Sequence, residues 1–280
     1  TANPAVADVD GDGAPEVFVA STGKTIYRIA ADGTPVWESD AYRGPEGSGS
    51  VTVANLDGEG DAELVFGAAV FDSDGRLLFE GAAGAGFAGQ GPITCVADLD
   101  GDARAEIVAG RTVYETSGTV AGGDFAGQAR VSASTPDGYC GIADLDGDGG
   151  PEVVLVASGR IHVLQGQTLA PLASVAIPGG GQGGAPNIAD FDGDGRPDIG
   201  TAGARNYVVA RYAPAGPSLE ILWRAPTEDD SSSRTGSSVF DFDGDGRAEV
   251  VYNDEEYLRI YPGTEPSCPS GPECDGVMTD

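Results

Sequence analysis

Apolar and polar residues alternate in short runs along most of the chain, and clusters of Gly, Asp, Pro and Ser separate these runs. Residues 152–157 and 160–164 are two such runs, with a Ser-Gly turn between them. Alternation with period two predicts β-strands, whereas an amphipathic helix needs apolar residues three and four apart over roughly 11 residues or more. No segment has that helical period, so the pattern predicts an all-β chain.

One acidic loop of nine residues, flanked by strand-like runs, recurs six times. We number the copies loops 1 to 6 in chain order; their first residues are Asp8, Asn55, Asp98, Asp144, Asp190 and Asp241. These positions are 47, 43, 46, 46 and 51 residues apart, so six periods fill the 280 residues. Each period has room for four short strands, and the acidic loop joins the first to the second. Four strands per period of this length are typical of a β-propeller blade. We therefore expect a β-propeller of four-stranded antiparallel blades, six in this chain.

The last period has no clear fourth strand after Tyr261. Either residues 275–280 supply that edge strand, or the native protein continues beyond this chain. We expect one propeller domain over residues 1–262 and a Cys-containing edge strand or linker over residues 263–280. An open blade exposes a strand edge, so we also expect the chain to be part of a larger multidomain protein.

The acidic loop has the donor pattern of a metal site, with carboxylates at positions 1, 3, 5 and 9. Hard divalent cations take six to eight oxygen ligands, and the Gly at position 6 permits the sharp turn that brings such ligands together. The apolar residue at position 2 is expected to point away from the site and hold the loop on the core. Oxygen-only donors with high negative charge favour Ca²⁺ over zinc or copper, and Mg²⁺ prefers to keep several waters. An EF-hand differs, because it closes with Glu at position 12 between helices.

The sequence thus predicts up to six Ca²⁺ sites, and purely structural metals are the favoured interpretation because no base or nucleophile stands beside the loops. The candidate ligands occupy positions 1, 3, 5 and 9 of each loop: Asp8, Asp10, Asp12 and Glu16; Asn55, Asp57, Glu59 and Glu63; Asp98, Asp100, Asp102 and Glu106; Asp144, Asp146, Asp148 and Glu152; Asp190, Asp192, Asp194 and Asp198; Asp241, Asp243, Asp245 and Glu249.

Loops 2 and 3 depart from the pattern. Loop 2 has Asn55 at position 1 and the longer Glu59 at position 5, so we expect it to bind a cation more weakly. Loop 3 has Ala103 at position 6, where a positive φ costs a residue other than Gly about 1 kcal/mol.

The pattern Asp-x-Asp-Gly-Asp-Gly-x-x-(Glu/Asp) between two strands, on a period near 47 residues, resembles the FG-GAP/VCBS repeat. This resemblance covers essentially the whole chain. It implies the calcium-binding propeller of integrin α-subunits and of many bacterial secreted proteins, with calcium at the matching loop positions. Seven blades, the commonest number in that family, is the alternative to six.

Neighbouring strands of an antiparallel blade run in opposite directions, so successive loops alternate between two faces of the propeller. The acidic loops share one face with the turns between third and fourth strands, and the connections between blades lie on the other. The resemblance implies that this second face carries ligand. The candidates that we place there are Tyr42, Arg43, Glu46, Asp137, Tyr139, Asp229, Asp230 and Arg234.

Acidic residues outnumber basic ones by 45 to 15, which gives a formal net charge of −30. Nucleic acid and anionic membrane surfaces would repel such a chain, so we expect neither as a partner. No run approaches the roughly 18 apolar residues of a membrane span, so we expect no direct membrane insertion. Of the 45 acidic residues, 23 stand at ligand positions, and without them the net charge would be −7. About half of the acidity therefore belongs to the predicted cation sites.

The chain has four cysteines. Cys268 and Cys274 bracket a short Pro/Gly-rich stretch and are expected to form a local disulfide, which favours an oxidising, extracellular location. Cys95 and Cys140 lie in the innermost strands of consecutive blades, offset by one position relative to their loops. That offset argues weakly against pairing, and free buried thiols remain an alternative.

These observations favour a calcium-stabilised extracellular recognition or adhesion module that binds a protein or a glycan. The alternatives are a carbohydrate-active enzyme resembling polysaccharide lyases, and a scaffold domain of a larger surface protein. We expect no enzyme, because no catalytic constellation stands out and the single histidine, His162, lies in an alternating strand. Trp37 and Trp223 occupy equivalent fourth strands and are expected to pack between blades.

Overall fold

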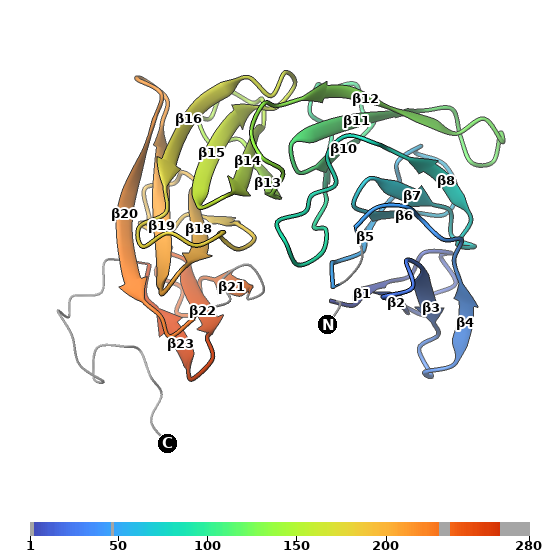
Figure 1. The fold of residues 1–280 in the computed structure, drawn as a ribbon, viewed down its shortest axis with the longest axis horizontal. Coiled ribbons are helices and arrows are strands. Elements are labelled where there is room, and N and C mark those ends of the chain that lie inside the picture. The colour runs from blue at the N-terminus through green and yellow to red at the C-terminus, as the bar shows by residue number, and fades with distance from the viewer. Residues whose placement is uncertain (1–2, 46–47, 230–235, 264–280) are drawn as a thin grey trace. The chain divides into compact units, whose positions relative to one another are not determined.

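The chain consists of antiparallel β-sheets in the computed structural model, which describes residues 3–45, 48–229 and 236–263. These residues form six sheets of consecutive strands, five of four strands and one of three (Figure 1). They contain no α-helix, and hence none that is long and apolar enough to cross a membrane. The architecture confirms an all-β chain with six sheets of the blade type.

The chain divides into two compact units, Thr1–Cys140 and Gly141–Asp280. The strands of the first unit form three sheets. Sheet 1 holds β1 (Ala5–Ala7), β2 (Glu16–Ala20), β3 (Ile26–Ile29) and β4 (Pro35–Glu38). Sheet 2 holds β5 (Thr52–Ala54), β6 (Glu63–Phe66), β7 (Ala69–Phe71) and β8 (Leu77–Glu80). Sheet 3 holds β9 (Cys95–Ala97), β10 (Glu106–Ala109), β11 (Thr112–Ser117) and β12 (Ala126–Ser132).

The second unit repeats this plan, and the boundary between the units falls within β13. Sheet 4 holds β13 (Tyr139–Ala143), β14 (Glu152–Ala157), β15 (Arg160–Gln165) and β16 (Pro171–Ala176). Sheet 5 holds β17 (Asn187–Ala189), β18 (Asp198–Gly203), β19 (Asn206–Ala213) and β20 (Ser218–Pro226). Sheet 6 holds β21 (Ser237–Phe240), β22 (Glu249–Asn253) and β23 (Leu258–Tyr261).

Like strands of neighbouring sheets lie beside one another within each unit. In the first unit β5 contacts both β1 and β9, and β8 contacts β12; in the second β17 contacts β21, and β16 contacts β20. The second strands of sheets 2 to 5 are buried along their whole length, because both of their faces are covered. Every residue of β14 is buried, for example. A strand covered on both faces has a continuous apolar sequence, as in this run of Val, Leu and Ala.

Aromatic residues of the fourth strands pack between sheets, as the sequence predicted. The Trp37 indole Nε1 donates a hydrogen bond to the Ser73 carbonyl in the turn of sheet 2. The Trp223 Nε1 donates to the Gly263 carbonyl, and its ring lies 6.1 Å from that of Tyr261 in sheet 6. Both indoles therefore join neighbouring sheets within their own unit.

Cys95 and Cys140 form a disulfide, with Cα atoms 6.1 Å apart. The weak argument against pairing is therefore wrong. Cys95 begins β9 and Cys140 is the second residue of β13, so they differ by one position relative to their loops. A Cα separation of this size is ordinary for a disulfide, so an offset of one residue does not prevent the bond. The expected Cys268–Cys274 disulfide lies outside the described residues.

Sheet 6 differs from the others in two respects. Its described part has three strands, and the edge strand considered at residues 275–280 lies outside the described residues. The position-2 residue is buried in loops 1 to 5, but Phe242 in loop 6 is 58% exposed. The expectation that this residue holds the loop on the core is therefore wrong for loop 6. The ring of Phe242 lies instead against Phe240, which is also exposed.

Candidate metal centres and connection side

Each acidic loop folds around its first side chain. In loop 4 the amides of Gly147 and Gly149 donate to the two carboxylate oxygens of Asp144, at 2.7 and 3.0 Å. Loops 5 and 6 have the same pair of hydrogen bonds to Asp190 and Asp241. This geometry requires a positive φ at positions 4 and 6, which Gly adopts without a steric penalty. Ala103 adopts φ 71° at position 6 of loop 3, as expected.

The position-9 carboxylate folds back and accepts a hydrogen bond from the backbone amide of position 2 in every loop. The six acceptors are Glu16, Glu63, Glu106, Glu152, Asp198 and Glu249, at donor–acceptor distances of 2.7–3.3 Å. The first five of these are buried. Each is the first residue of the second strand of its sheet, so the regular strand fixes its backbone.

Burial makes four of these carboxylates more difficult to ionise. Burial raises the pKa of Glu63 to about 7, and it also raises the pKa of Asp198 to about 7. Burial raises the pKa of Glu106 and Glu152 above the ordinary value too, and neighbouring Asp side chains of the same loops add to the effect. A bound cation would remove this penalty, because an opposite charge nearby favours the ionised form.

Five loops bring three carboxylates together, with one oxygen of each within 4.8 Å of the others. The groups are Asp8, Asp10 and Glu16; Asp98, Asp100 and Glu106; Asp144, Asp146 and Glu152; Asp190, Asp192 and Asp194; and Asp241, Asp243 and Asp245. Oxygens bound to one Ca²⁺ at roughly 2.3–2.6 Å lie at most about 5.2 Å apart. The described loops therefore fit a hard cation in both donor type and spacing.

Loop 2 is not among the five groups, in line with its departure from the pattern. The Asn55 Oδ1 accepts the Gly58 amide at 2.7 Å, so the turn itself forms. One Asp57 carboxylate oxygen accepts the Val120 amide from the turn of sheet 3. Beside the loop lies a cavity of about 240 Å³ lined by Glu59, Gly60, Asp61, Glu63, Asp72, Ser73, Val120 and Ala121.

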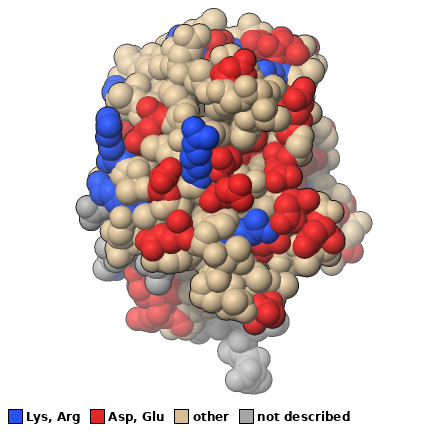
Figure 2. Space-filling model, turned by 90° about the vertical axis from the view of Figure 1, so that its right-hand side faces the viewer, with Lys and Arg blue, Asp and Glu red and all other residues tan. Residues whose placement is uncertain are grey.

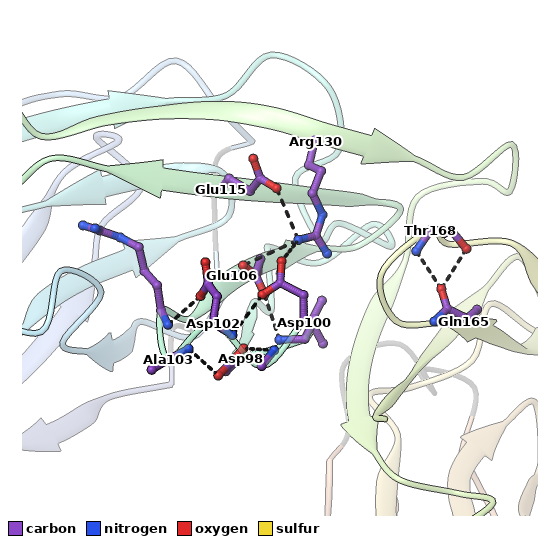
Figure 3. Close-up of polar contacts among 12 residues, drawn as sticks. Asp98, Asp100, Asp102, Ala103, Glu106, Glu115, Arg130, Gln165 and Thr168 are labelled. Carbon is purple, nitrogen blue, oxygen red and sulfur yellow. Dashed lines mark hydrogen bonds and ion pairs between the residues drawn. The ribbon is translucent and has the colours of Figure 1, made fainter. Parts of the chain in front are cut away.

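Arginines that the sequence analysis missed reach three of the loops. Figure 3 shows Arg130 pointing at loop 3, where its Nη1 lies 2.9 Å from Asp100 and 3.6 Å from Glu106. Arg28 approaches loop 1 and holds the pKa of Asp10 below its ordinary value through a hydrogen bond. Arg211 approaches loop 5. The sequence could have predicted the contact of Arg28, because pairing of its strand with the preceding one in an antiparallel hairpin brings it close to Glu16.

On the connection side of each unit, the turns between second and third strands contact the connections between sheets. The Tyr42 amide donates to the Lys24 carbonyl, and the Thr227 amide donates to the Arg205 carbonyl. On the opposite side the acidic loops contact one another, since Ala62 donates to Val9 and Ala248 donates to Asp190. The predicted separation of two sides holds within each unit.

Several candidates for ligand contact have structural roles instead. Tyr42, Tyr139 and Asp229 are buried, with at most 3% of each residue exposed. Tyr42 packs against Phe66 and Phe71, and the Asp229 carboxylate accepts a hydrogen bond from the Tyr252 hydroxyl. These side chains are not available to a ligand, because residues distant in sequence cover them.

Asp137 is half-buried and accepts hydrogen bonds from the amides of Ala85, Phe87 and Arg111, so it joins two connections of the first unit. Glu46, Asp230 and Arg234 lie outside the described residues.

Arg43 is exposed and lines a cavity of about 520 Å³ on the connection side of the first unit. The other lining residues are Gly44, Pro45, Glu80, Gly81, Ala82, Ala83, Gly84 and Ala85. One Glu80 carboxylate oxygen accepts the amides of Arg43 and Gly44 at 2.6 and 2.7 Å. On the opposite wall of the cavity, the Tyr114 hydroxyl accepts a hydrogen bond from the Ala83 amide and donates one to the Gly84 carbonyl.

On the face shown in Figure 2, patches of Asp and Glu are spread among other residues, and patches of Lys and Arg are fewer. His162 is half-buried, and burial lowers the pKa of its imidazole, with Arg160 adding to the effect.

Comparison with known proteins finds a similar repeat in two parts of the chain. A model of the FG-GAP-like repeat matches residues 8–66 and 144–201, which include loops 1 and 2 and loops 4 and 5. No curated protein matches the chain.

Solved structures share the fold. The V. cholerae biofilm matrix protein Bap1 has a TM-score of 0.66 at 16% identity, covering 94% of this chain and 68% of its own. BBS1N in complex with ARL6DN has a TM-score of 0.58 at 11% identity, covering 94% and 78%. The C-terminal WD40 domain of Sif2 has a TM-score of 0.52 at 14% identity, covering 89% and 66%. At these identities the likeness concerns the fold alone.

Proposed function

We propose that this chain, which contains FG-GAP-like repeats, is a calcium-stabilised extracellular recognition module that binds a protein or a glycan on its connection side. The repeated carboxylate groups, with oxygens within 4.8 Å of one another, are the observation that carries the proposal. The Cys95–Cys140 disulfide supports an extracellular location, because disulfides persist in oxidising compartments.

The proposed role of the cation is structural. A bound Ca²⁺ supplies positive charge to oxygens that otherwise repel one another. The chain contributes the loop geometry: backbone amides orient the position-1 carboxylate, and the second strand fixes position 9. A cation that binds the folded loop but not the unfolded chain stabilises the fold by mass action, by about 2.7 kcal/mol per site at a concentration 100 times its dissociation constant.

Scanning calorimetry with Ca²⁺ and then with excess EDTA tests this role. We expect EDTA to lower the melting temperature. In the loop 4 variant Asp146→Asn/Asp148→Asn the gain from Ca²⁺ should shrink, because two ligands lose their charge. The control Glu220→Gln removes an exposed carboxylate outside the loops and should keep the full gain. An equal melting temperature in Ca²⁺ and in EDTA would contradict the calcium proposal.

The proposed binding site is the 520 Å³ cavity beside Arg43. The Arg43 side chain is exposed, whereas most backbone amides of the lining already donate within the protein. The Arg43 guanidinium can donate to a sugar hydroxyl or to a peptide carbonyl, and both ligand classes carry such acceptors.

A glycan array probed with the whole chain, with and without EDTA, tests recognition. Arg43→Gln should weaken binding to any glycan that the array identifies. The control Arg76→Gln removes an equal charge from an exposed turn on the acidic-loop side and should leave binding unchanged. Glycan binding that survives Arg43→Gln places the ligand elsewhere, and an empty array favours a protein ligand or a scaffold role.

A further inference from the structure

An arginine guanidinium bridges the same two ligand positions in loops 1, 3 and 5. In loop 1 the Arg28 Nη2 lies 2.6 Å from the position-3 carboxylate of Asp10 and 3.0 Å from the position-9 carboxylate of Glu16. In loop 3 the Arg130 Nη1 reaches Asp100 and Glu106, at positions 3 and 9 (Figure 3).

Arg211 completes the set in loop 5. It pairs with Asp192 at position 3, lies 3.2 Å from Asp194 at position 5 and 3.4 Å from Asp198 at position 9. The three arginine side chains are mostly buried, at 12%, 17% and 30% exposure. Each guanidinium therefore pairs with carboxylates that are candidate cation ligands.

The three arginines come from different places in their sheets. Arg28 lies on β3 opposite Phe18, and Arg211 lies on β19 next to the Ile199–Ala210 pair. Arg130 lies on a fourth strand, β12, at an irregularity in the pairing with β11. The three arginines do not stand at equivalent positions of the repeat, so the repeat does not explain why all of them reach ligand positions 3 and 9. The shared feature is the charge at positions 3 and 9.

Loops 4 and 6 have the same acidic positions without such an arginine. Among the described residues, no ion pair within 4 Å reaches Asp146, Glu152, Asp243 or Glu249. Tyr212 lies near loop 4, where burial and then the charges of Glu152 and Asp146 raise the pKa of its phenol, but it carries no positive charge. The Arg247 side chain in loop 6 lies against Gly193 of loop 5.

We infer that Arg28, Arg130 and Arg211 are internal counter-ions that compete with Ca²⁺, so that loops 4 and 6, whose positions 3 and 9 pair with no arginine among the described residues, bind the cation more tightly than loops 1, 3 and 5. This inference rests on the proposed calcium-binding function. A carboxylate oxygen that is paired with a guanidinium carries less free negative charge for a cation, so Ca²⁺ binding to an arginine-bearing loop has to weaken or break these ion pairs. The described residues place no such competitor at positions 3 and 9 of loops 4 and 6, and like-charge repulsion in these loops favours cation binding.

Calcium titration calorimetry on the whole chain tests the inference. We expect a tight class that loops 4 and 6 provide and a weaker class from the arginine-bearing loops. Asp146→Asn should remove one tight site, whereas Asp192→Asn, at the same position of loop 5, should leave the tight class intact. Arg211→Gln should tighten one weak site by about tenfold, as expected if 1.4 kcal/mol of competition is lost. The control Arg160→Gln removes an equal charge whose described partner is Ser174, outside any acidic loop.

Melting experiments supply a second readout. In EDTA, Arg211→Gln should melt below the wild type, because the loop 5 carboxylates lose their counter-ion. In saturating Ca²⁺ the deficit should disappear. Arg28→Gln gives the same comparison in loop 1 if the loop 5 variant does not fold.

The titrations distinguish failure of the proposed calcium function from failure of the counter-ion inference. A wild type that binds no Ca²⁺ overturns the proposed calcium function. A wild type that binds Ca²⁺, but whose Arg211→Gln and Arg28→Gln variants titrate like Arg160→Gln, overturns the counter-ion inference alone. Loss of a tight site in Asp192→Asn would also overturn it.

Discussion

At the scale of single residues, the acidic loops show how backbone conformation and charge depend on one another. The amides of positions 4 and 6 can point at the first carboxylate only when φ is positive there. Gly occupies position 6 in loops 1, 2, 4, 5 and 6. A Cβ added to any of these five glycines would meet no atom within 4 Å. The constraint at this position is therefore conformational rather than steric crowding by neighbours.

Ala103→Gly is expected to stabilise the chain. Ala103 has φ 71°, and a left-handed conformation costs a residue with a Cβ about 1 kcal/mol relative to Gly. Scanning calorimetry should show a rise of about 2–4 °C in melting temperature. Ala14→Gly is the matched control, since Ala14 is exposed and has no positive φ. It should lower the melting temperature slightly, and equal shifts for both variants would contradict the conformational explanation.

His162 should make stability depend on pH. Burial favours the neutral imidazole, so the folded pKa lies below the ordinary 6.5 and the unfolded chain binds the proton more readily. Stability is then greatest above about pH 6.5 and falls as the pH drops through the unfolded pKa. His162→Gln should show a smaller loss of unfolding free energy between pH 8 and pH 5.5 than the wild type.

Proton NMR gives a direct check of this shift. The chain has one histidine, so a single imidazole signal titrates. A midpoint at or above 6.5 in the folded protein would contradict the predicted direction.

At the scale of the elements, the disulfide joins the first strand of sheet 3 to the beginning of β13. The two cysteines are 45 residues apart in sequence, so the bond closes a whole repeat. The chain-entropy model gives about 4 kcal/mol of stabilisation for a closed loop of about 45 residues.

Reduction should therefore destabilise the chain. Unfolding in urea with and without a reductant should show a lower midpoint when Cys95–Cys140 is reduced. The variant Cys95→Ser/Cys140→Ser should unfold at that lower midpoint and respond far less to the reductant. A variant as stable as the oxidised wild type would show that packing alone holds β9 and β13 together.

At the scale of the whole molecule, net charge opposes the folded state. A charge of −30 on a chain of this size produces self-repulsion, which three arginines and any bound cations offset locally. Dissolved salt screens the same repulsion over distances of about 10 Å at 0.1 M.

Raising NaCl from about 10 to about 500 mM in EDTA should therefore raise the melting temperature, because the Debye length shortens over this range. In saturating Ca²⁺ the same increase in salt should have a smaller effect, since bound cations already neutralise part of the charge. An equal response to salt in both buffers would mean that the loops contribute little to the repulsion.

The amino-acid sequence determined the features that depend on neighbours along the chain. Strand runs follow a period of two residues, and the loop is complete within nine residues, so six sheets and the acidic groups of five loops were predictable. The absence of loop 2 from the carboxylate groups of the described residues was visible for the same reason, since loop 2 is a local departure from the repeat.

Tertiary structure alone decided what depends on distant neighbours. The pairing of Cys95 with Cys140 and the burial of Tyr42 are set by strands from different sheets. Phe242 stands at position 2, which is apolar in every loop, yet its side chain is exposed. The arginines at loops 1, 3 and 5 reach their targets from three different strand positions, through register and side-chain direction. The repeat therefore specified where the acidic loops lie, and packing between strands specified which of them hold an internal counter-ion.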